Sequence, residues 1–357
     1  MKLKHGSSLY YVTDKNIYDA LNEHKVDSAT VAKLFERRNT LVGPSTSRNW
    51  LAEYFSRLGH DFYDHQSISQ RLGVVPRRER ITSIDVSGVP SQTALDAAIQ
   101  EAKERLESQG EVVNVVRRDG AVVLNVQYTL IDYRRSEFNQ RQVRDGSIEF
   151  QATTSGYVVR NTQNDHVNSV RDLVLSKVAV EDGKPVQKVA VSLFPFPNSK
   201  TRSLFFFDLF TGIPDYLLRD VTDVHVFKPG SFSDLDDIED THVERVSLRG
   251  RGLTRSDYLT SLGDDEYYVY RVAWRCKERL GKGVEYDLEA LFADPESCTG
   301  FSYIVLGVYD ADDGLVSKQR RAPSRHEVAV LSQAIEMRSR ELMQALRHKP
   351  AELCDAN

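Results

Sequence analysis

The sequence is poor in cysteine, with only three such residues, which lie far apart at positions 276, 298 and 354. Their number is odd and no Cys-x-x-Cys spacing occurs, so we expect neither a disulfide framework nor a cysteine-based zinc site. No segment approaches the ~18 uninterrupted apolar residues that a membrane span needs. The first residues include two lysines but no apolar core, which is unlike a secretory signal. These absences lead us to expect a cytoplasmic protein that does not contact a membrane.

Familiar catalytic motifs are absent too. There is no Gly-x-x-x-x-Gly-Lys-Ser/Thr loop, no Gly-x-Ser-x-Gly elbow and no His-Glu-x-x-His motif. A restriction-type nuclease needs clustered carboxylates for Mg²⁺ and a lysine near the attacking water. Asp132 with Glu149, and Asp287 with Glu289, come nearest to this pattern, but no lysine completes either. We therefore expect no catalysis, metal or cofactor, and keep a divergent metal-dependent nuclease as the alternative.

The residues that are present are typical of a globular protein, with 40% hydrophobic and 28% charged residues and a net charge of -5. The charge is unevenly distributed. From Lys33 to Arg80, nine basic residues stand against five acidic ones, whereas the run from Asp234 to Glu244 is strongly acidic. This asymmetry is compatible with a local nucleic-acid footprint on an otherwise neutral protein.

Up to about residue 80 the spacing of apolar residues predicts short helices around Ile17, Val31, Leu51 and Ile68. Residues suited to cap the first three are Asp14, then Asp27 or Ser28, then one of Ser45, Thr46 and Ser47. The third helix should carry its apolar stripe on Leu51, Tyr54, Phe55 and Leu58. We therefore expect a small all-helical domain over residues 1–80.

The rest of the chain, residues 81–357, alternates between helix and strand signals. A helix is predicted over 91–110, and hairpin turns at Asp119-Gly120 and Ser155-Gly156. Further strand-like runs cover 186–194, 221–227, 267–279, 284–292 and 300–310. A long C-terminal helix should start at Ser324, whose spacing to Glu327 fits a capping box.

The predicted fold class is therefore α+β, with a mainly antiparallel sheet and flanking helices after the helical N-terminal domain. Hairpins followed by a helix occur twice. This order suggests a duplication into two β-rich subdomains, 81–230 and 231–357, although no residue-level repeat is visible.

The segments "SATVAKLFERRN", "TLVG" and "STSRNWLAEYFSRL" follow one another within the helical domain. This layout resembles that of SAP-like (helix-extended-helix) DNA-binding domains, over roughly thirty of the 357 residues. In that family the second helix carries a leucine-rich, basic face, and the resemblance implies DNA binding here. The family's usual lysine after the turn glycine is replaced by Pro44.

Elementary electrostatics points to the same segment. The start of a helix presents unpaired N–H groups and a partial positive charge that can hold a phosphate. We expect phosphate contacts from a cluster at the start of the second helix of this motif: Arg37, Arg38, Ser45, Ser47 and Arg48. The alternative is a helical hairpin that docks on the body with its arginines solvated.

Two further basic stretches are candidates for nucleic-acid contact. The connector contributes Arg77, Arg78 and Arg80. A connection between two strands contributes Arg134, Arg135, Arg141 and Arg144. Either stretch can equally be a solvated loop. The aromatic run Phe205–Phe207 is interpreted as core or as a protein interface.

Taken together, the sequence predicts a DNA-binding protein, with RNA not excluded. The predicted role is that of a non-catalytic recognition or adaptor subunit in a prokaryotic multi-protein system such as antiviral defence. A protein partner, and a homodimer through the C-terminal helix, are also expected. A protein-interaction scaffold is the alternative that needs no nucleic acid.

Overall fold

The computed structural model describes residues 13–23, 26–73, 79–88, 91–118, 120–134, 137–181, 186–230, 243–250, 252–253, 257–312 and 315–348. The chain divides into two compact units. Unit 1 comprises Met1–Arg78 and Gln92–Ile148, and unit 2 comprises Glu79–Ser91 and Glu149–Asn357. Helices and antiparallel strands are both abundant, which confirms the predicted α+β class.

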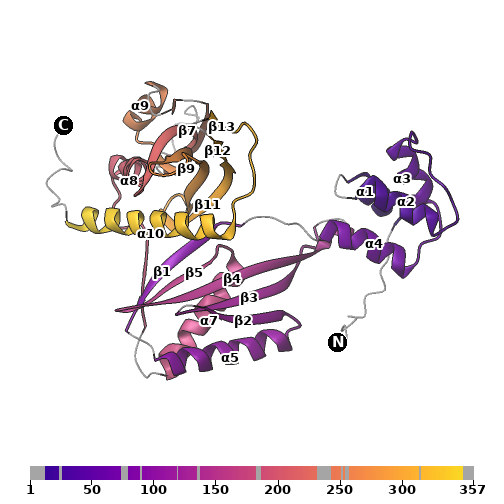
Figure 1. The fold of residues 1–357 in the computed structure, drawn as a ribbon, viewed down its shortest axis with the longest axis horizontal. Coiled ribbons are helices and arrows are strands. Elements are labelled where there is room, and N and C mark those ends of the chain that lie inside the picture. Colours follow the sequence, from indigo (N-terminus) through magenta and orange to yellow (C-terminus); the bar gives the residue numbers. More distant parts are fainter. Residues whose placement is uncertain are drawn as a thin grey trace, which may run out of the picture. The chain divides into compact units, whose positions relative to one another are not determined.

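Unit 1 begins with four helices, which we call the head (Figure 1): α1 (Asp14–Asn22), α2 (Ser28–Glu36), α3 (Arg48–Ser56) and α4 (Phe62–Gly73). All four were predicted from apolar periodicity. Asp27 caps α2 as expected, since its carboxylate accepts from the backbone N–H of Thr30 at 2.6 Å. The cap of α1 is Thr13 rather than Asp14, because the Thr13 hydroxyl lies 3.2 Å from the Asn16 N–H and Asp14 falls inside the first turn.

Helices of nine residues, such as α1, α2 and α3, are too short to be stable alone in water. Their stability comes from a shared core that includes Leu34, Phe35 and Phe55. Phe138, from the short helix α6 (Glu137–Gln140), completes this core and stacks on His65 at 4.6 Å between ring centroids. The connection that carries α6 is thereby fixed to the head.

The rest of unit 1 contains α5 (Gln92–Ser108), β2 (Val112–Arg118), β3 (Ala121–Ile131) and the start of β4 (Arg141–Thr153), with strands in the order β2-β3-β4. The predicted hairpin is confirmed, since Arg118 pairs with Ala121 and Gly120 has the positive φ that the turn requires. Asp119 itself lies outside the described residues. Helix α5 packs against β2.

Unit 2 contains most of the sheet. Its strands are β1 (Ile81–Ser87), β5 (Gly156–Thr162), β6 (Gln187–Ala190), β7 (Tyr216–Phe227), β8 (Arg245–Arg249), β9 (Tyr268–Glu278), β10 (Glu285–Asp294), β11 (Thr299–Tyr309), β12 (Ala311–Asp312) and β13 (Leu315–Val316). The order of neighbours is β5-β1-β11-β10-β9-β7-β8, with β6 also pairing with β1, while β12 and β13 form a separate pair. The strands of the larger sheet pair antiparallel. The hairpin predicted at Ser155-Gly156 joins β4 to β5.

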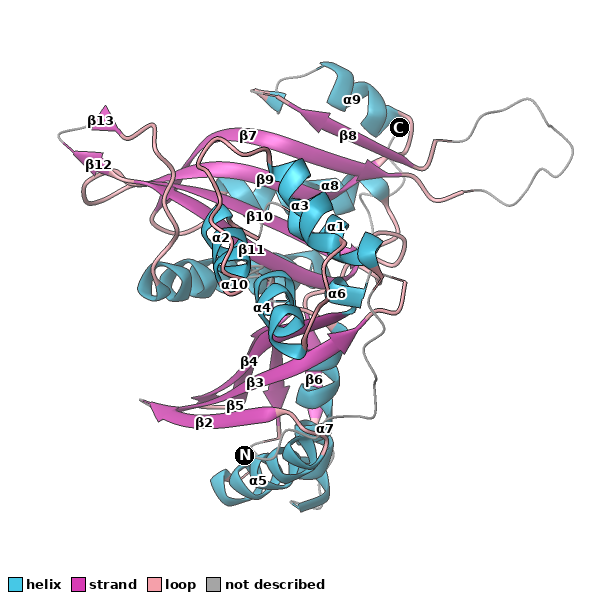
Figure 2. Cartoon of the chain, turned by 90° about the vertical axis from the view of Figure 1, so that its right-hand side faces the viewer, coloured by secondary structure: helices cyan, strands magenta, loops and turns pink. Residues whose placement is uncertain are grey.

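The helices of unit 2 are α7 (Asp165–Glu181), α8 (Ser199–Thr211), α9 (Asp257–Asp264) and α10 (Arg325–His348). Helices α8 and α10 pack against β9 and β11 (Figure 2). The core between helices and sheet buries Phe205 and Phe206, which confirms that the aromatic run is interior. Leu331 and Ile335 of α10 lie in the same core, so the apolar face of this helix is covered by its own unit.

The start of α10 shows the predicted capping box. The Ser324 N–H donates to Glu327 Oε2 at 2.7 Å, and the Glu327 N–H donates to Ser324 Oγ at 3.3 Å. Arg321 adds a paired hydrogen bond to the Glu327 carboxylate, at 2.6 and 2.9 Å. This contact holds the pKa of Glu327 down at about 2.

One order of elements occurs twice along the chain: a strand, a helix, four strands and a closing helix. The first set is β1, α5, β2, β3, β4, β5 and α7, and the second is β6, α8, β7, β9, β10, β11 and α10. Helices α6 and α9 and strands β8, β12 and β13 are insertions into these sets. The duplication stays a prediction: this order starts its second set at Gln187, whereas the predicted second subdomain started at residue 231.

Candidate nucleic-acid interface

The start of α3 is the part of the head that the SAP-like resemblance singled out. The turn before it is closed by a hydrogen bond from the Thr46 N–H to the Gly43 carbonyl at 3.0 Å. Ser47 is the N-cap residue, but its side chain makes no capping hydrogen bond. Ser45 and Ser47 are both exposed. The hydroxyl groups predicted to meet a phosphate are thus accessible.

The three arginines predicted beside these serines have different surroundings. The guanidinium of Arg48 donates to the carbonyls of Leu21 and Val26, where α1 ends, and burial lowers its pKa. Arg38 forms an ion pair with Asp64 at 2.5 Å and lies over the ring of Phe55. These two side chains therefore hold the head together.

Arg37 is the arginine of this group whose guanidinium could still bind a phosphate. It is exposed, and its hydrogen-bond partner among the described residues is the neutral hydroxyl of Ser67, at 2.9 Å. The head as a whole, residues 13–73, has eight basic and eight acidic residues and so no net charge. Half of the basic surplus counted from Lys33 to Arg80 lies in the connector, and acidic residues before Lys33 offset the other half.

The head instead exposes aromatic side chains. Trp50 and Tyr54 stack nearly parallel on α3, with ring centroids 5.3 Å apart and planes 9° apart. Tyr54 in turn stacks on the buried Phe35, at 6.2 Å and 18°. Trp50 is 54% exposed and Tyr54 is 46% exposed. The prediction that Tyr54 belongs to the buried stripe was wrong, because Tyr54 pairs with Trp50 one turn earlier at the solvent surface.

The other predicted arginines do not form one cluster. Arg77, Arg78 and Arg135 lie outside the described residues, as does the side chain of Arg141. Arg134 is exposed and binds Asp132 at 3.0 Å, and this hydrogen bond raises its pKa. Arg144 donates to Gln142 at 2.9 Å. Among the predicted arginines, Arg80 belongs to a larger group of charged side chains in unit 2.

That group lies on the face of the unit 2 sheet opposite the core. Strands place successive side chains on opposite faces, so Val272 and Trp274 point into the core while Arg271 and Arg275 point away from it. Helices α8, α9 and α10 all contribute side chains to the core face. Over β7, β9 and β10 the opposite face carries ion pairs, while α7 packs on the sheet at β5, where Arg171 donates to Asn161 at 3.1 Å.

Four carboxylates on this face are bound by arginine, while Asp220 accepts from the Gly252 N–H at 2.8 Å. Glu289 accepts from Arg80 Nε at 2.9 Å and from Arg271 Nη2 at 2.7 Å. Three further pairs continue the pattern: Arg275 with Asp287 at 2.8 Å, Arg219 with Glu285 at 3.1 Å and Arg249 with Asp223 at 3.2 Å. We call these five arginines, 80, 219, 249, 271 and 275, the arginine layer.

The arginines cover the carboxylates. The Glu289 side chain is 6% exposed, whereas those of Arg80 and Arg271 are 33% and 31% exposed. Arg249 is the most exposed member, at 83%. Asp223 beneath it is nearly buried and also lies 3.1 Å from His225, whose pKa is lowered by burial. In each of these pairs the guanidinium group is therefore more exposed to solvent than its carboxylate.

Sequence reasoning considered Asp287 and Glu289 as nuclease ligands and named Arg80 as a nucleic-acid contact, but it did not connect Arg80 with Arg271 or with the rest of the arginine layer. The available signal was the alternation of charge along two runs, with arginines in 271–275 and carboxylates in 285–289. The strand register then sets Asp287 opposite Arg275 and Glu289 opposite Ala273. In the described part of the chain, no group of three or more His, Cys, Asp or Glu side chains could hold a metal.

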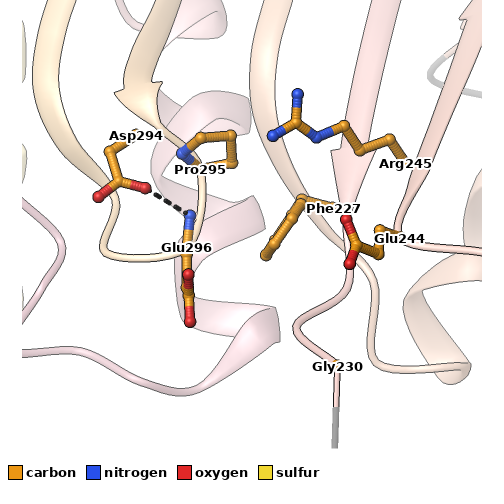
Figure 3. Close-up of a pocket in the computed structure, with 7 residues that line it drawn as sticks. All are labelled: Phe227, Gly230, Glu244, Arg245, Asp294, Pro295 and Glu296. Atoms are coloured by element: carbon orange, nitrogen blue, oxygen red, sulfur yellow. Dashed lines mark hydrogen bonds between the residues drawn. The ribbon is translucent and has the colours of Figure 1, made fainter.

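A separate cavity of 370 Å³ lies beside Phe227 and Arg245 (Figure 3). Its other lining residues are Gly230, Glu244, Asp294, Pro295 and Glu296. Asp294 accepts hydrogen bonds from the Glu296 N–H at 3.1 Å and the Ser297 hydroxyl at 2.6 Å, and the latter lowers its pKa. This carboxylate is therefore used by its own turn.

No family model matches the chain, and no curated protein matches it in sequence. Membership of the SAP-like family stays a prediction. The helices in the described part of the chain include none that is long and apolar enough to cross a membrane.

Proposed function

We propose that the protein is a non-catalytic nucleic-acid-binding protein whose arginine layer contacts phosphates. The observation that carries this proposal is the arrangement of partly exposed guanidinium groups above nearly buried carboxylates, on the sheet face of unit 2 that lies opposite the core. Guanidinium groups bind phosphate in a planar, two-pronged geometry. The carboxylates reduce the net charge of these side chains, so the proposal depends on their exposure: Arg219 and Arg249 are 56% and 83% exposed, whereas the paired Arg38 of the head is 21% exposed.

The same contacts argue against the nuclease alternative. A carboxylate that ligates Mg²⁺ must be free to face the ion. Asp287 is bound by Arg275, and Glu289 by two arginines. Glu149, the other candidate, lies 3.3 Å from Arg160. An adaptor role in antiviral defence, a protein partner and a homodimer stay predictions, because no contact in the structure bears on them.

The proposal is tested by fluorescence anisotropy with labelled single-stranded and duplex DNA and RNA, at about 50 and about 200 mM salt. The test variant is R219A/R249A, which removes the two most exposed members of the arginine layer. Each lost phosphate contact should lower the slope of log affinity against log salt by about 0.7–0.9 and weaken binding at low salt. The control is R117A, which removes an exposed arginine paired with Asp96 in unit 1.

Two results would overturn the proposal. One is that the wild-type protein binds none of these nucleic acids at low salt. The other is that R219A/R249A binds as tightly, and with the same salt slope, as the wild type and R117A.

A further inference from the structure

We infer that the head recognises unpaired bases, which stack on the exposed indole of Trp50. This inference rests on the proposed function and specifies its ligand as nucleic acid with at least one unstacked base: a single strand, a loop or a frayed end. It concerns a site in unit 1 that is separate from the arginine layer of unit 2.

The geometry of the three rings is the first argument. Phe35, Tyr54 and Trp50 follow one another with interplanar angles of 18° and 9°. One end of this run, Phe35, is buried in the core of the head at 1% exposure, and the other end, Trp50, is in solvent. A planar base placed on Trp50 continues the run as its next member. Because Trp50 and Tyr54 already support each other, the platform needs no rearrangement to receive it.

The charge of the head is the second argument. A protein that grips duplex DNA needs several free cations along the phosphate track. Arg38 and Arg48 are committed to Asp64 and to backbone carbonyls, and the head has no net charge. Stacking on a single exposed ring needs contact with only one base, and every base has an aromatic face, so a site with few free cations is better suited to one unstacked base than to a length of duplex.

The two tryptophans of the chain make the inference directly measurable. Trp50 is 54% exposed, whereas Trp274 is 1% exposed in the core of unit 2. A base stacked on Trp50 should quench its emission and leave that of Trp274 unchanged. Full-length protein is titrated with an oligothymidylate of about 12 residues, and separately with a blunt duplex of the same length. We expect quenching with the single strand and much less with the duplex.

Substitutions then test the role of the ring. W50A should weaken single-strand binding by about 5- to 150-fold, which corresponds to the ~1–3 kcal/mol of one base–aromatic stack. W50F keeps an aromatic face and should retain most of the affinity. The matched control is F194A, because Phe194 of unit 2 is an exposed aromatic residue, at 67%, that belongs to no ring stack in the described structure. F194A should bind like the wild type.

The outcomes separate this inference from the proposed function. If wild-type protein binds the single strand but W50A binds equally well, stacking on Trp50 is wrong and the arginine layer stands. Stacking on Trp50 is also wrong if W50A weakens binding of the duplex and of the single strand by the same factor. If the wild type binds neither nucleic acid, both proposals fail. Quenching of Trp50 emission in the wild type, together with retained single-strand affinity in W50F, would support the inference.

Discussion

Replacing Glu289 by glutamine should lower stability and raise affinity for nucleic acid at the same time. Glu289 is the carboxylate shared by Arg80 and Arg271. E289Q removes its charge but leaves a side chain of the same size with one acceptor oxygen. The two arginines then keep their positive charges without the carboxylate that lay between them.

The size of the loss follows from the exposure of the three groups. Breaking a fully buried ion pair costs ~3–5 kcal/mol, and breaking an exposed one costs ~0–1 kcal/mol. The carboxylate is 6% exposed but the guanidinium groups are about one-third exposed, at 33% and 31%. Water can therefore solvate the arginines once the charge between them is gone. We expect a decrease of ~1–3 kcal/mol in the free energy of unfolding, between these limits.

The assay is urea denaturation followed by the emission of Trp274, which is buried in unit 2, in a W50F background that removes the signal of the head. The control is E341Q, because Glu341 forms an exposed pair with Arg338 three residues away on α10. It should change stability by less than ~0.5 kcal/mol. A change as small as this in E289Q would refute the buried-pair reasoning.

Although E289Q should be less stable, its affinity for nucleic acid should increase. In E289Q the positive charges of Arg80 and Arg271 are no longer neutralised by the carboxylate. The variant should therefore bind nucleic acid more tightly at low salt, and its affinity should fall more steeply as salt rises. E341Q should leave binding unchanged. Unchanged or weaker binding by folded E289Q would count against the arginine layer as the contact surface, whatever its effect on stability.

Two further predictions concern acid stability and the head. Glu327 has its pKa lowered from the ordinary 4.5 to about 2 by Arg321, so its contribution is complete above pH 4.5 and is lost as the pH falls toward 2. Because Arg321 is partly exposed, that contribution is at most ~1 kcal/mol. The free energy of unfolding of E327Q should therefore fall by about this much less than that of the wild type between pH 4.5 and pH 2. R48A should destabilise the head by ~1–3 kcal/mol, since buried carbonyls of Leu21 and Val26 lose their donor. Trp50 emission in urea measures this, and an unchanged midpoint would show that Arg48 is not structural.

The sequence by itself determined the local structure. The caps of α2 and α10, the turn between β2 and β3 and the positions of the four short helices of the head all depend on residues within a few positions of one another. The interactions involved, such as the hydrogen bond from the Thr30 N–H to the Asp27 carboxylate, join residues within one helical turn. Signals of this range can be read without knowing the fold.

Only the tertiary structure decided which charges are available. Arg38 and Arg48 have the sequence context of phosphate ligands, but the packing of the head turns them toward Asp64 and the end of α1. Arg80 reaches Glu289 across 209 positions of sequence, because the order and register of the strands place them together. Whether an arginine is free or neutralised depends on such distant partners, and no local pattern contains that information.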